Sequence, residues 1–538
     1  MKQMTWIITT LLVGILAGCN TEEPFMDELV TTSHIVTITA GSEDNATKAA
    51  ISDALAFTWT TGDQIAVHTT DGYKTSSALT SGDSPSATFT VDLGEGTRQN
   101  YAVYPASAAL ASYATAENLR VHYADTYSYN SNADFSPMVM IAKGNAPGTN
   151  LSFKHVGALV RMTVNNIPPE ATKLTFTFQY KVTGDFPVSN PDTDAPDVTT
   201  TTSESDNVVT FHLPDHAGTW WDGKVFNIPV PCQVMGTVVC AAFKGSDKLL
   251  EGTCTIPNMT RAKGTKKTIY LPVFSVSDTK KVTIAKSNLQ ATTSNNWSTY
   301  SFSFMEYPWS IVETTNVSAD YSGSTAVGLF GWATSGYNSK NPNMTSTTDS
   351  EYGPNISSGE WTVDSNDWDW GYHNSIGGYS NHIWRVLTSS EWLYLFGMTA
   401  NNTDNGTITS RYLKYGRATV AGVEGIVIVP DDFIDPRTNG GSGSFTGGTG
   451  SAFTSNIYTS GTDWNAMAAA GAVFLPIANV RNGTILEIIP AGLYWSSTAM
   501  MGNNANHLVF SSSGIFPNMT TNRNKRYYGK SVRLVRDL

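Results

Sequence analysis

Short segments that alternate between apolar and polar residues fill the first half of the chain, and they constrain its fold more than any other feature. Each segment is rich in β-branched or aromatic residues and is bounded by Gly, Pro, Asn or Asp. This pattern predicts the strands of an all-β sandwich. The strands are expected at residues 34–40, 56–59, 64–68, 86–91, 100–104, 158–164, 173–180, 208–213, 225–230, 237–243 and 267–271.

The second half of the chain adds two helices to the short strands. Thr388 and Glu391 have the spacing of a capping box, and the apolar residues that follow predict a helix that ends at Gly397. Thr462 or Asp463 is expected to cap a second helix. Short strands are expected around them at residues 281–284, 425–429, 473–475, 508–510 and 531–535. Helices among short strands and long loops predict an α+β domain.

The N-terminus carries an export signal. Lys2 is followed by an apolar run at residues 6–16, and the small residues directly before Cys19 complete a bacterial lipobox. A short transmembrane anchor is the alternative, but the apolar run is too short to span a bilayer comfortably. We therefore expect a signal peptide at residues 1–18, lipidation of Cys19 and a polar tether at 19–33. This lipid anchor predicts attachment to the outer membrane and exposure at the cell surface.

The charge and cysteine content exclude several classes of protein. The formal net charge is −12, and only 14% of the residues are charged, which argues against a nucleic-acid partner. Cys232, Cys240 and Cys254 remain after lipidation, and an odd count excludes a complete disulfide framework. One bridge between two of them is possible, but buried free thiols are the favoured interpretation.

Three motifs in the first half resemble a known family. They are WTTGDQIAV at residues 59–67, YAVYP at 101–105 and FKH at 153–155. In this order behind a lipobox, they resemble the fimbrillin family of type V pilus subunits. The resemblance implies two transthyretin-like β-sandwiches, which we place at residues 34–149 and 150–274. Residues 275–280 then form a linker.

The second half resembles a C-type-lectin-like domain of the formylglycine-generating-enzyme branch. This resemblance spans residues 281–538, so the fold class is all-β sandwiches followed by an α+β lectin-like domain. It looks especially like the variable target proteins of diversity-generating retroelements, in which mutagenesis rewrites a C-terminal cassette. The motifs are NLQ at 288–290, LFGW at 329–332, WRVLTSSEW at 384–392, IVIVPDD at 426–432, AGAVFLP at 470–476, YWSST at 494–498 and SVRLVRD at 531–537.

The resemblance implies a variable region at about residues 494–536. This region has no Asp or Glu from 499 to 530 and is rich in Asn, whose codons are rich in adenine. A disordered or turn-rich loop is the alternative. The residues expected in the core are Trp495, Ser496, Ser497, Leu508, Phe510, Gly529, Val532 and Leu534. The residues expected on a solvent-facing ligand site are Met500, Met501, Asn503, Asn504, Asn506, His507, Phe516, Asn518, Asn522, Asn524, Lys525, Arg526, Tyr527, Tyr528 and Lys530.

Such a face predicts a macromolecular ligand. About twenty side chains can cover roughly 800 Å² on one partner, which is the size of a standard protein interface. We therefore expect a host or microbial surface protein or glycoprotein rather than one small sugar. Arg523, Lys525, Arg526 and Lys530 predict a basic patch that would favour acidic partners.

The sequence offers little chemistry. Formylglycine-generating enzymes act through cysteines, and residues 275–538 contain none, so we expect no catalytic residue, no cofactor and no enzyme. His373 and His382 lie in one loop, but this is a weak metal signal. Asp364, Asp367 and Asp369 could bind calcium. A solvated loop is the favoured interpretation, so no metal is expected.

The fimbrillin resemblance also implies assembly with other type V pilus subunits by strand addition. Acceptance of a strand requires proteolytic loss of the first strand after a basic residue, and the candidate is Lys48, where better-known members use Arg. The chain stops directly after residues 531–535, so we expect no segment to donate and a place at the fimbrial tip. The alternatives are a purely structural or anchoring subunit and a membrane-tethered receptor.

Overall fold

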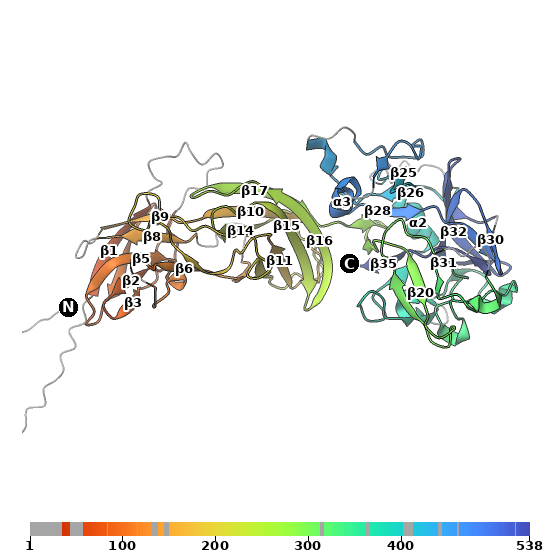
Figure 1. Ribbon diagram of the computed structural model, residues 1–538, viewed down its shortest axis with the longest axis horizontal. Coiled ribbons are helices and arrows are strands. Elements are labelled where there is room, and N and C mark those ends of the chain that lie inside the picture. The colour runs from red at the N-terminus through yellow and green to blue at the C-terminus, as the bar shows by residue number, and fades with distance from the viewer. Residues whose placement is uncertain are drawn as a thin grey trace, which may run out of the picture.

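The computed structural model describes residues 35–42, 58–82, 84–113, 115, 117–130, 138–144, 150–312, 317–361, 366–401, 411, 413–439, 444–459, 462–521 and 523–538. The predicted lipidation site Cys19 and the predicted processing site Lys48 lie outside these residues. Figure 1 shows an elongated molecule with three masses of strands in a row, which we call the first, second and third modules. The third module follows the second directly, and the chain ends where these two meet.

The first module is one seven-stranded sheet in the order β3-β2-β5-β8-β9-β1-β4. The sheet curls, because the N–H of Ser77, just after β3, donates to the carbonyl of Thr90 in β4 at 2.8 Å. Trp59 is fully buried inside the curl and contacts three aromatic rings edge-on. The strands are β1 Ile35–Ser42, β2 Ala66–Thr69, β3 Gly72–Thr75, β4 Ser86–Asp92, β5 Arg98–Tyr104, β8 Met140–Lys143 and β9 Asn150–His155.

The position of β1 in this sheet bears on assembly. β1 pairs antiparallel with β4 along seven residues and parallel with β9 at residues 39–42. It therefore lies between two strands, and its apolar residues Ile38 and Ala40 are fully buried.

The second module packs two sheets around one core that draws residues from both. Their orders are β14-β10-β17 and β16-β15-β11-β13-β7. The core includes Cys240; Cys232 is also buried, Cys254 is half-buried, and all three are free thiols, as predicted. The strands are β7 Thr126–Ser128, β10 Ala158–Asn165, β11 Lys173–Thr177, β13 Val208–His212, β14 Lys224–Val230, β15 Gly236–Lys244, β16 Asp247–Ile256 and β17 Gly264–Tyr270.

The first two modules exchange strands, so the expected boundary after residue 149 is wrong. β9 begins at Asn150 but belongs to the first sheet, whereas β7 precedes it and pairs with β13 of the second module. A further pair joins β6 (Arg120–Tyr123) to β12 (Gly184–Pro187). Local alternation locates strands but carries no information about their partners, and this is why the boundary was misplaced.

The third module holds five small sheets in the described residues, with orders β18-β19-β35-β24, β21-β20-β22, β23-β31-β32-β33, β27-β25-β26-β28 and β30-β29-β34. Three short α-helices accompany them in the described part. The strands are β18 Phe274–Ser275, β19 Lys281–Ile284, β20 Leu289–Thr292, β21 Ser301–Phe304, β22 Ala326–Val327, β23 Gly359–Glu360, β24 Arg385–Val386, β25 Tyr415–Val420, β26 Val423–Ile428, β27 Ile457–Tyr458, β28 Val473–Pro476, β29 Val480–Asn482, β30 Ile485–Glu487, β31 Ala491–Met500, β32 Asn504–Ser511, β33 Ile515–Met519, β34 Tyr528–Gly529 and β35 Leu534–Asp537. The helices are α1 Trp370–His373, α2 Ser389–Leu395 and α3 Thr462–Ala469.

The predicted capping box is confirmed at the start of α2. The Thr388 hydroxyl accepts from the N–H of Glu391 at 3.1 Å, and the Glu391 carboxylate accepts from the N–H of Thr388 at 2.9 Å. Gly397 follows the helix with φ of +62°, a conformation that favours glycine. The second predicted helix is confirmed as α3. The four-residue helix α1 had no counterpart in the sequence prediction.

Residues 275–280, predicted as a linker, form the turn of a β-hairpin. β18 pairs with β19, and Val276 between them is buried. The Ser275 hydroxyl donates to Asp431 at 2.6 Å. The chain thus passes from the second module to the third through hydrogen-bonded, buried residues, and the prediction of a linker is wrong.

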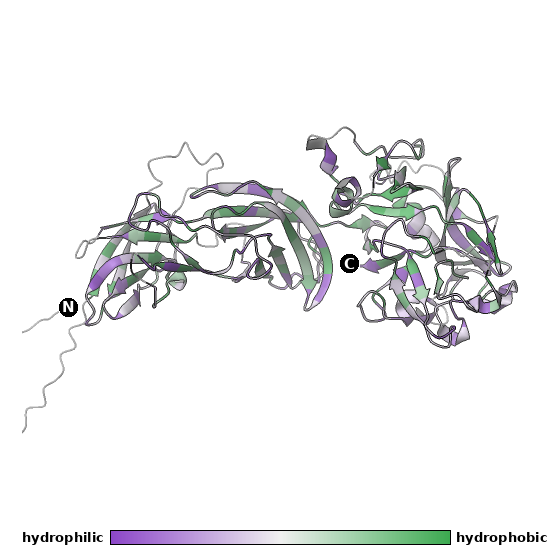
Figure 2. Cartoon of the chain, in the orientation of Figure 1, coloured by the Kyte–Doolittle hydropathy of each residue, from purple (hydrophilic) through white to green (hydrophobic). Residues whose placement is uncertain are grey.

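Hydrophobic and hydrophilic residues alternate along many strands in Figure 2, as the sequence predicted for half-buried sheets. None of the described helices has the length and apolar character needed to cross a membrane.

Candidate functional site

The predicted variable region is built around a hairpin of β31 and β32 in the third module. The eight residues expected in the core are all buried, which confirms that prediction. Trp495 donates through Nε1 to the carbonyl of Phe330 at 2.7 Å. Ser496 donates to the carbonyl of Asn506 in the facing strand at 2.8 Å. The hairpin is therefore fixed from inside by its own small and aromatic residues.

Two stretches of this region lie side by side and form what we call the distal face, namely residues 500–504 and the described residues of the loop 520–528 (520, 521 and 523–528). They meet where Asn504 forms a β-bridge with Lys525, and the N–H of Ala505 donates to the carbonyl of Asn524 at 2.9 Å. Met501 at the turn is 79% exposed. The rings of Tyr527 and Tyr528 stack at 4.9 Å between centroids. The predicted residues that are half-buried here are Met500, Asn503, Asn504, Asn524, Lys525, Tyr527 and Tyr528.

Four residues predicted to face the ligand are buried, so their expected exposure is wrong. The exposed fraction is 8% for Asn506, 1% for Arg526 and zero for His507 and Lys530. Asn506 and His507 lie on β32, and their side chains are in the interior. The side chains of Arg526 and Lys530 are also inside, where they contact aromatic rings and donate to backbone carbonyls. Asn522 lies outside the described residues.

Phe516 and Asn518 do not lie on the distal face. Both are on β33, whose register pairs Phe516 with Val509 in the middle of β32. Asn518 donates through Nδ2 to the carbonyl of Ala400 at 3.3 Å. The structure thus separates these two residues from the turn and the loop.

The predicted basic patch is also wrong, because acidic side chains from outside the variable region neutralise its exposed cations. Arg523 donates through Nε to Glu487 at 2.9 Å, and Lys525 Nζ lies 3.1 Å from Asp349. The sequence analysis missed both acids. Glu487 is 36 positions and Asp349 is 176 positions from its partner. No local pattern signals a pair at such a separation.

The buried cations of the region are held by carbonyls and rings. Arg526 donates to the carbonyls of Pro354 at 2.8 Å and Ile356 at 2.6 Å, and it stacks over Trp332 at 4.4 Å. Burial lowers its pKa to about 10. Lys530 donates through Nζ to the carbonyl of Arg523 at 2.6 Å, and burial lowers its pKa well below the ordinary value. These two side chains tie the region to the core and are not available to a ligand.

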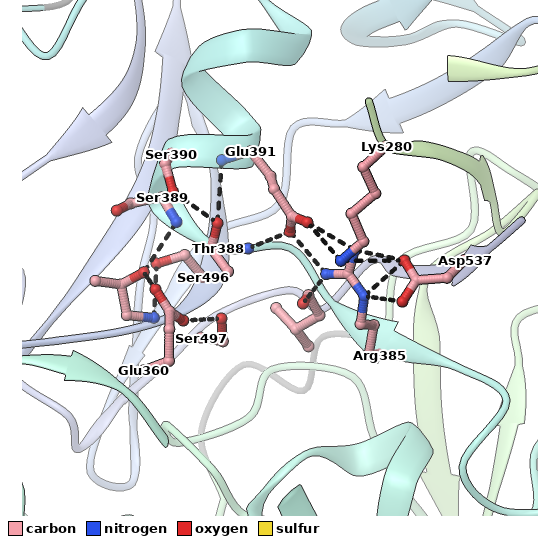
Figure 3. A network of polar contacts seen from close by, with 12 residues as sticks. Lys280, Glu360, Arg385, Thr388, Ser389, Ser390, Glu391, Ser496, Ser497 and Asp537 are labelled. Carbon is pink, nitrogen blue, oxygen red and sulfur yellow. Dashed lines mark hydrogen bonds and ion pairs between the residues drawn. The ribbon is translucent and has the colours of Figure 1, made fainter. Parts of the chain in front are cut away.

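A second polar cluster lies beneath α2 and joins three distant segments (Figure 3). Arg385 in β24 donates to both oxygens of Glu391 at 2.7 Å and to Asp537 in β35 at 2.6 Å. Burial alone would lower the pKa of Arg385, but the bonds to Asp537 and Glu391 outweigh it and raise this pKa. Lys280 adds an ion pair with Glu391 at 3.1 Å. All the charges of this cluster are paired with one another. The cluster therefore holds the three segments together and presents no reactive group.

A hollow of about 220 Å³ lies beside this cluster, lined in part by Glu360 and Asp369. Glu360 accepts from the hydroxyls of Ser497 at 2.5 Å and Thr498 at 2.8 Å. Burial raises the pKa of Asp369 to about 7, although two backbone N–H groups donate to its carboxyl oxygens. Asp369 caps α1, so its carboxylate is already used by the fold.

The acidic cluster considered for calcium does not form a site within the described residues. Asp364 lies outside them, and Asp369 is the buried cap of α1. Asp367 lies 3.9 Å from His373 and 4.0 Å from His382. In the described part of the chain, no three His, Cys, Asp or Glu side chains lie together in a way that could hold a metal ion.

No protein-family model and no curated protein matches the sequence. Among solved structures, the chain is similar to two candidate cell adhesion proteins, from Bacteroides uniformis and Bacteroides ovatus, each at 14% identity and a TM-score of 0.25 over 44% of this chain and 92% of theirs. It is also similar to a fimbrial protein from Bacteroides ovatus, at 10% identity and a TM-score of 0.20 over 89% of this chain and 94% of that one.

Proposed function

We propose that this chain is a cell-surface adhesin that binds a protein or glycoprotein through the distal face. One observation carries the proposal. Within a single segment, the framework residues are all buried, while the turn at Met501 and the loop that ends in Tyr527 and Tyr528 meet at the surface. Aromatic side chains and small polar ones on a rigid support are typical of binding sites that accept protein surfaces. In this proposal the chain acts by binding and not by catalysis.

The arrangement of the modules supports a role at the end of a fimbria. Figure 1 places β30 and β32 at the end of the molecule farthest from β1. We propose that the third module is a C-type-lectin-like head, and that the first two are fimbrillin-like. β1 lies between β4 and β9, so a strand from another subunit could take its place if cleavage at Lys48 released it. Without cleavage, the chain would act as a receptor tethered through Cys19.

The distal face is tested with beads that carry the whole chain and are offered to host epithelial cells and to neighbouring bacteria. One variant replaces Met501, Asn503 and Tyr527 by alanine. The matched control replaces Ser512 and Ser513, which are exposed in the β32–β33 turn. We expect the first variant to lose adhesion and the control to keep it. Equal adhesion by both variants, or strong binding of one sugar on a glycan array that survives the first variant, would refute the proposal.

The fimbrial and the tethered forms are separated by immunogold labelling with an antibody against the third module. Label at fibre ends supports the tip subunit. Label confined to the membrane, with residue 19 still covalently joined to residues 281–538, supports the tethered receptor. Label along whole fibres would favour a structural subunit. A second copy of the DNA for residues 494–536, differing at template adenines, would support diversification of the face.

A further inference from the structure

The distal face depends on two acids that lie outside the variable region. Residues 499–530 contain no Asp or Glu, yet the exposed cations of the loop both have a carboxylate partner. One partner, Asp349, begins the short 3-10 helix η5 (Asp349–Glu351), and the other, Glu487, ends β30. Both elements precede the loop in the sequence, η5 long before β31 and β30 directly before it.

Asp349 holds two consecutive residues of the loop. Its Oδ2 lies 3.1 Å from Lys525 Nζ, and its Oδ1 accepts from the N–H of Arg526 at 3.1 Å. The Asp349 side chain is only 17% exposed. A carboxylate that is largely withdrawn from water interacts more strongly with its partners than an exposed one, because the local dielectric constant is lower.

Glu487 binds Arg523 near the start of the loop, and Asn482 in turn fixes the Glu487 carboxylate. One of its oxygens accepts from Arg523 and the other accepts from Asn482 in β29, both at 2.9 Å. Arg523 has a φ of +59°, which an arginine rarely adopts without such support. Its carbonyl also accepts from Lys530. Two bonds, one to Glu487 and one from Lys530, therefore fix the side chain and the backbone of Arg523, where the loop turns back.

We propose that Asp349 and Glu487 are positioning residues, which hold the described residues of the loop 520–528 in one conformation and cancel the charge of its two partly exposed cations, so that the distal face accepts an uncharged protein surface. This inference rests on the proposed function of the distal face. An uncharged partner surface thus takes the place of the acidic partner that the sequence predicted for this face. What remains for contact is Met501, the amide of Asn503 and the tyrosine pair, which recognise apolar, hydroxyl and amide groups.

Preorganisation gives the physical advantage of this arrangement. A loop that is already ordered does not lose its conformational entropy again when a partner binds. Because Asp349 and Glu487 lie outside the variable region, they would keep the loop ordered while other residues of the loop are substituted. The arrangement also predicts that Arg523 and Lys525 serve the loop's own structure, and that binding depends little on ionic strength, since no unpaired charge attracts the partner.

Hydrogen–deuterium exchange of the whole chain, without any partner, tests the positioning role. In the variant D349N/E487Q, the amides of residues 519–530 should exchange about tenfold faster than in the wild type, because local opening no longer breaks two ion pairs. The matched control is Glu351→Gln, an exposed acid on the same short helix, and its exchange should stay at the wild-type rate. The charge exchange E487R/R523E should restore protection relative to Glu487→Gln alone. Unchanged exchange in D349N/E487Q would overturn the proposal.

Poly-L-glutamate serves as the probe of charge on the face. The wild type should bind it no more tightly at low salt than R523Q/K525Q does. D349N/E487Q should bind it about tenfold more tightly, because both cations lose their partners. Wild-type binding that R523Q/K525Q abolishes would overturn the neutral face. Neither measurement needs the natural partner, so these outcomes are independent of the adhesion test above.

Discussion

His507 carries a polar ring into the core of the third module, directly beneath the distal face. It is fully buried on β32, and its ring meets Trp495 edge-on at 5.9 Å. Burial lowers its pKa well below the ordinary 6.5, and the neighbouring Lys530 lowers it further. A neutral histidine is therefore built into the folded state. Protonating this histidine in the folded chain therefore costs free energy, because of its burial and of the nearby Lys530.

This cost predicts a loss of stability in acid. As the pH falls below 6.5, the unfolded chain takes up a proton at His507 that the folded chain refuses. The free energy of unfolding should therefore decrease by up to about 1.4 kcal/mol per pH unit until the folded pKa is reached. In His507→Leu this component should disappear. Melting curves of both proteins between neutral and acidic pH measure it, with the exposed His212→Gln as the control. Parallel pH profiles for wild type and His507→Leu would contradict the prediction.

At the scale of elements, two sets of interactions of different strength hold the start of α2, namely a capping box and the ion pairs of Arg385. The capping box at Thr388 supplies local hydrogen bonds to the first turn. The ion pairs of Arg385 reach further, because they join β24 and α2 to β35 near the end of the chain. The side chains of Arg385 and Glu391 are 13% and 11% exposed. Without Arg385, the largely buried Glu391 carboxylate would keep only the more exposed Lys280 as a cationic partner.

Removing Arg385 should therefore cost much more than removing the cap. Arg385→Met should lower the free energy of unfolding by about 3 kcal/mol, the lower end of the range for a broken buried pair, since Glu391 stays largely buried and keeps only Lys280 as a cationic partner. Thr388→Ala should cost about 1 kcal/mol. Denaturant unfolding monitored by tryptophan fluorescence measures both. Lys244→Gln breaks an exposed pair with Glu170 and should change the stability by at most about 1 kcal/mol. Equal effects of the first two variants would show that the cluster adds nothing beyond the cap.

At the scale of the whole molecule, the second and third modules share a bonded joint. Asn166 donates to Asp432 at 3.0 Å, and Arg536 donates to the carbonyl of Lys248 at 2.8 Å. Leu538 packs against the core of the second module. The first and second modules exchange strands in turn. The third module is thus held in a fixed direction relative to the second, as the proposed binding site at the end of an elongated molecule requires.

This joint predicts that the second and third modules unfold together. Differential scanning calorimetry of the wild type should show them in one transition, because each loses contacts when the other unfolds. N166A/R536A should broaden this transition, since it removes two of the side-chain links and leaves others, such as the Lys286–Glu251 ion pair, in place. Lys263→Ala, an exposed residue of the second module, is the control and should leave the trace unchanged. Two separate transitions in the wild type would contradict the prediction.

The sequence by itself determined the features that depend on near neighbours along the chain. Alternation located most strands of the first two modules but few of the short strands of the third, and the spacing of Thr388 and Glu391 located α2. In each case the physical cause acts within a few residues, as a side-chain direction, a cap or a turn.

Only the tertiary structure decided which residues pair across the fold. It moved β9 into the first sheet and β7 into the second, and it turned residues 275–280 into a hairpin. It also decided that Lys530 is buried, and that Asp349 and Glu487 neutralise the exposed cations of the loop. These outcomes depend on groups that lie tens or hundreds of positions apart. Composition shows that such charges exist, but their distance and their access to water are set only when the chain has packed.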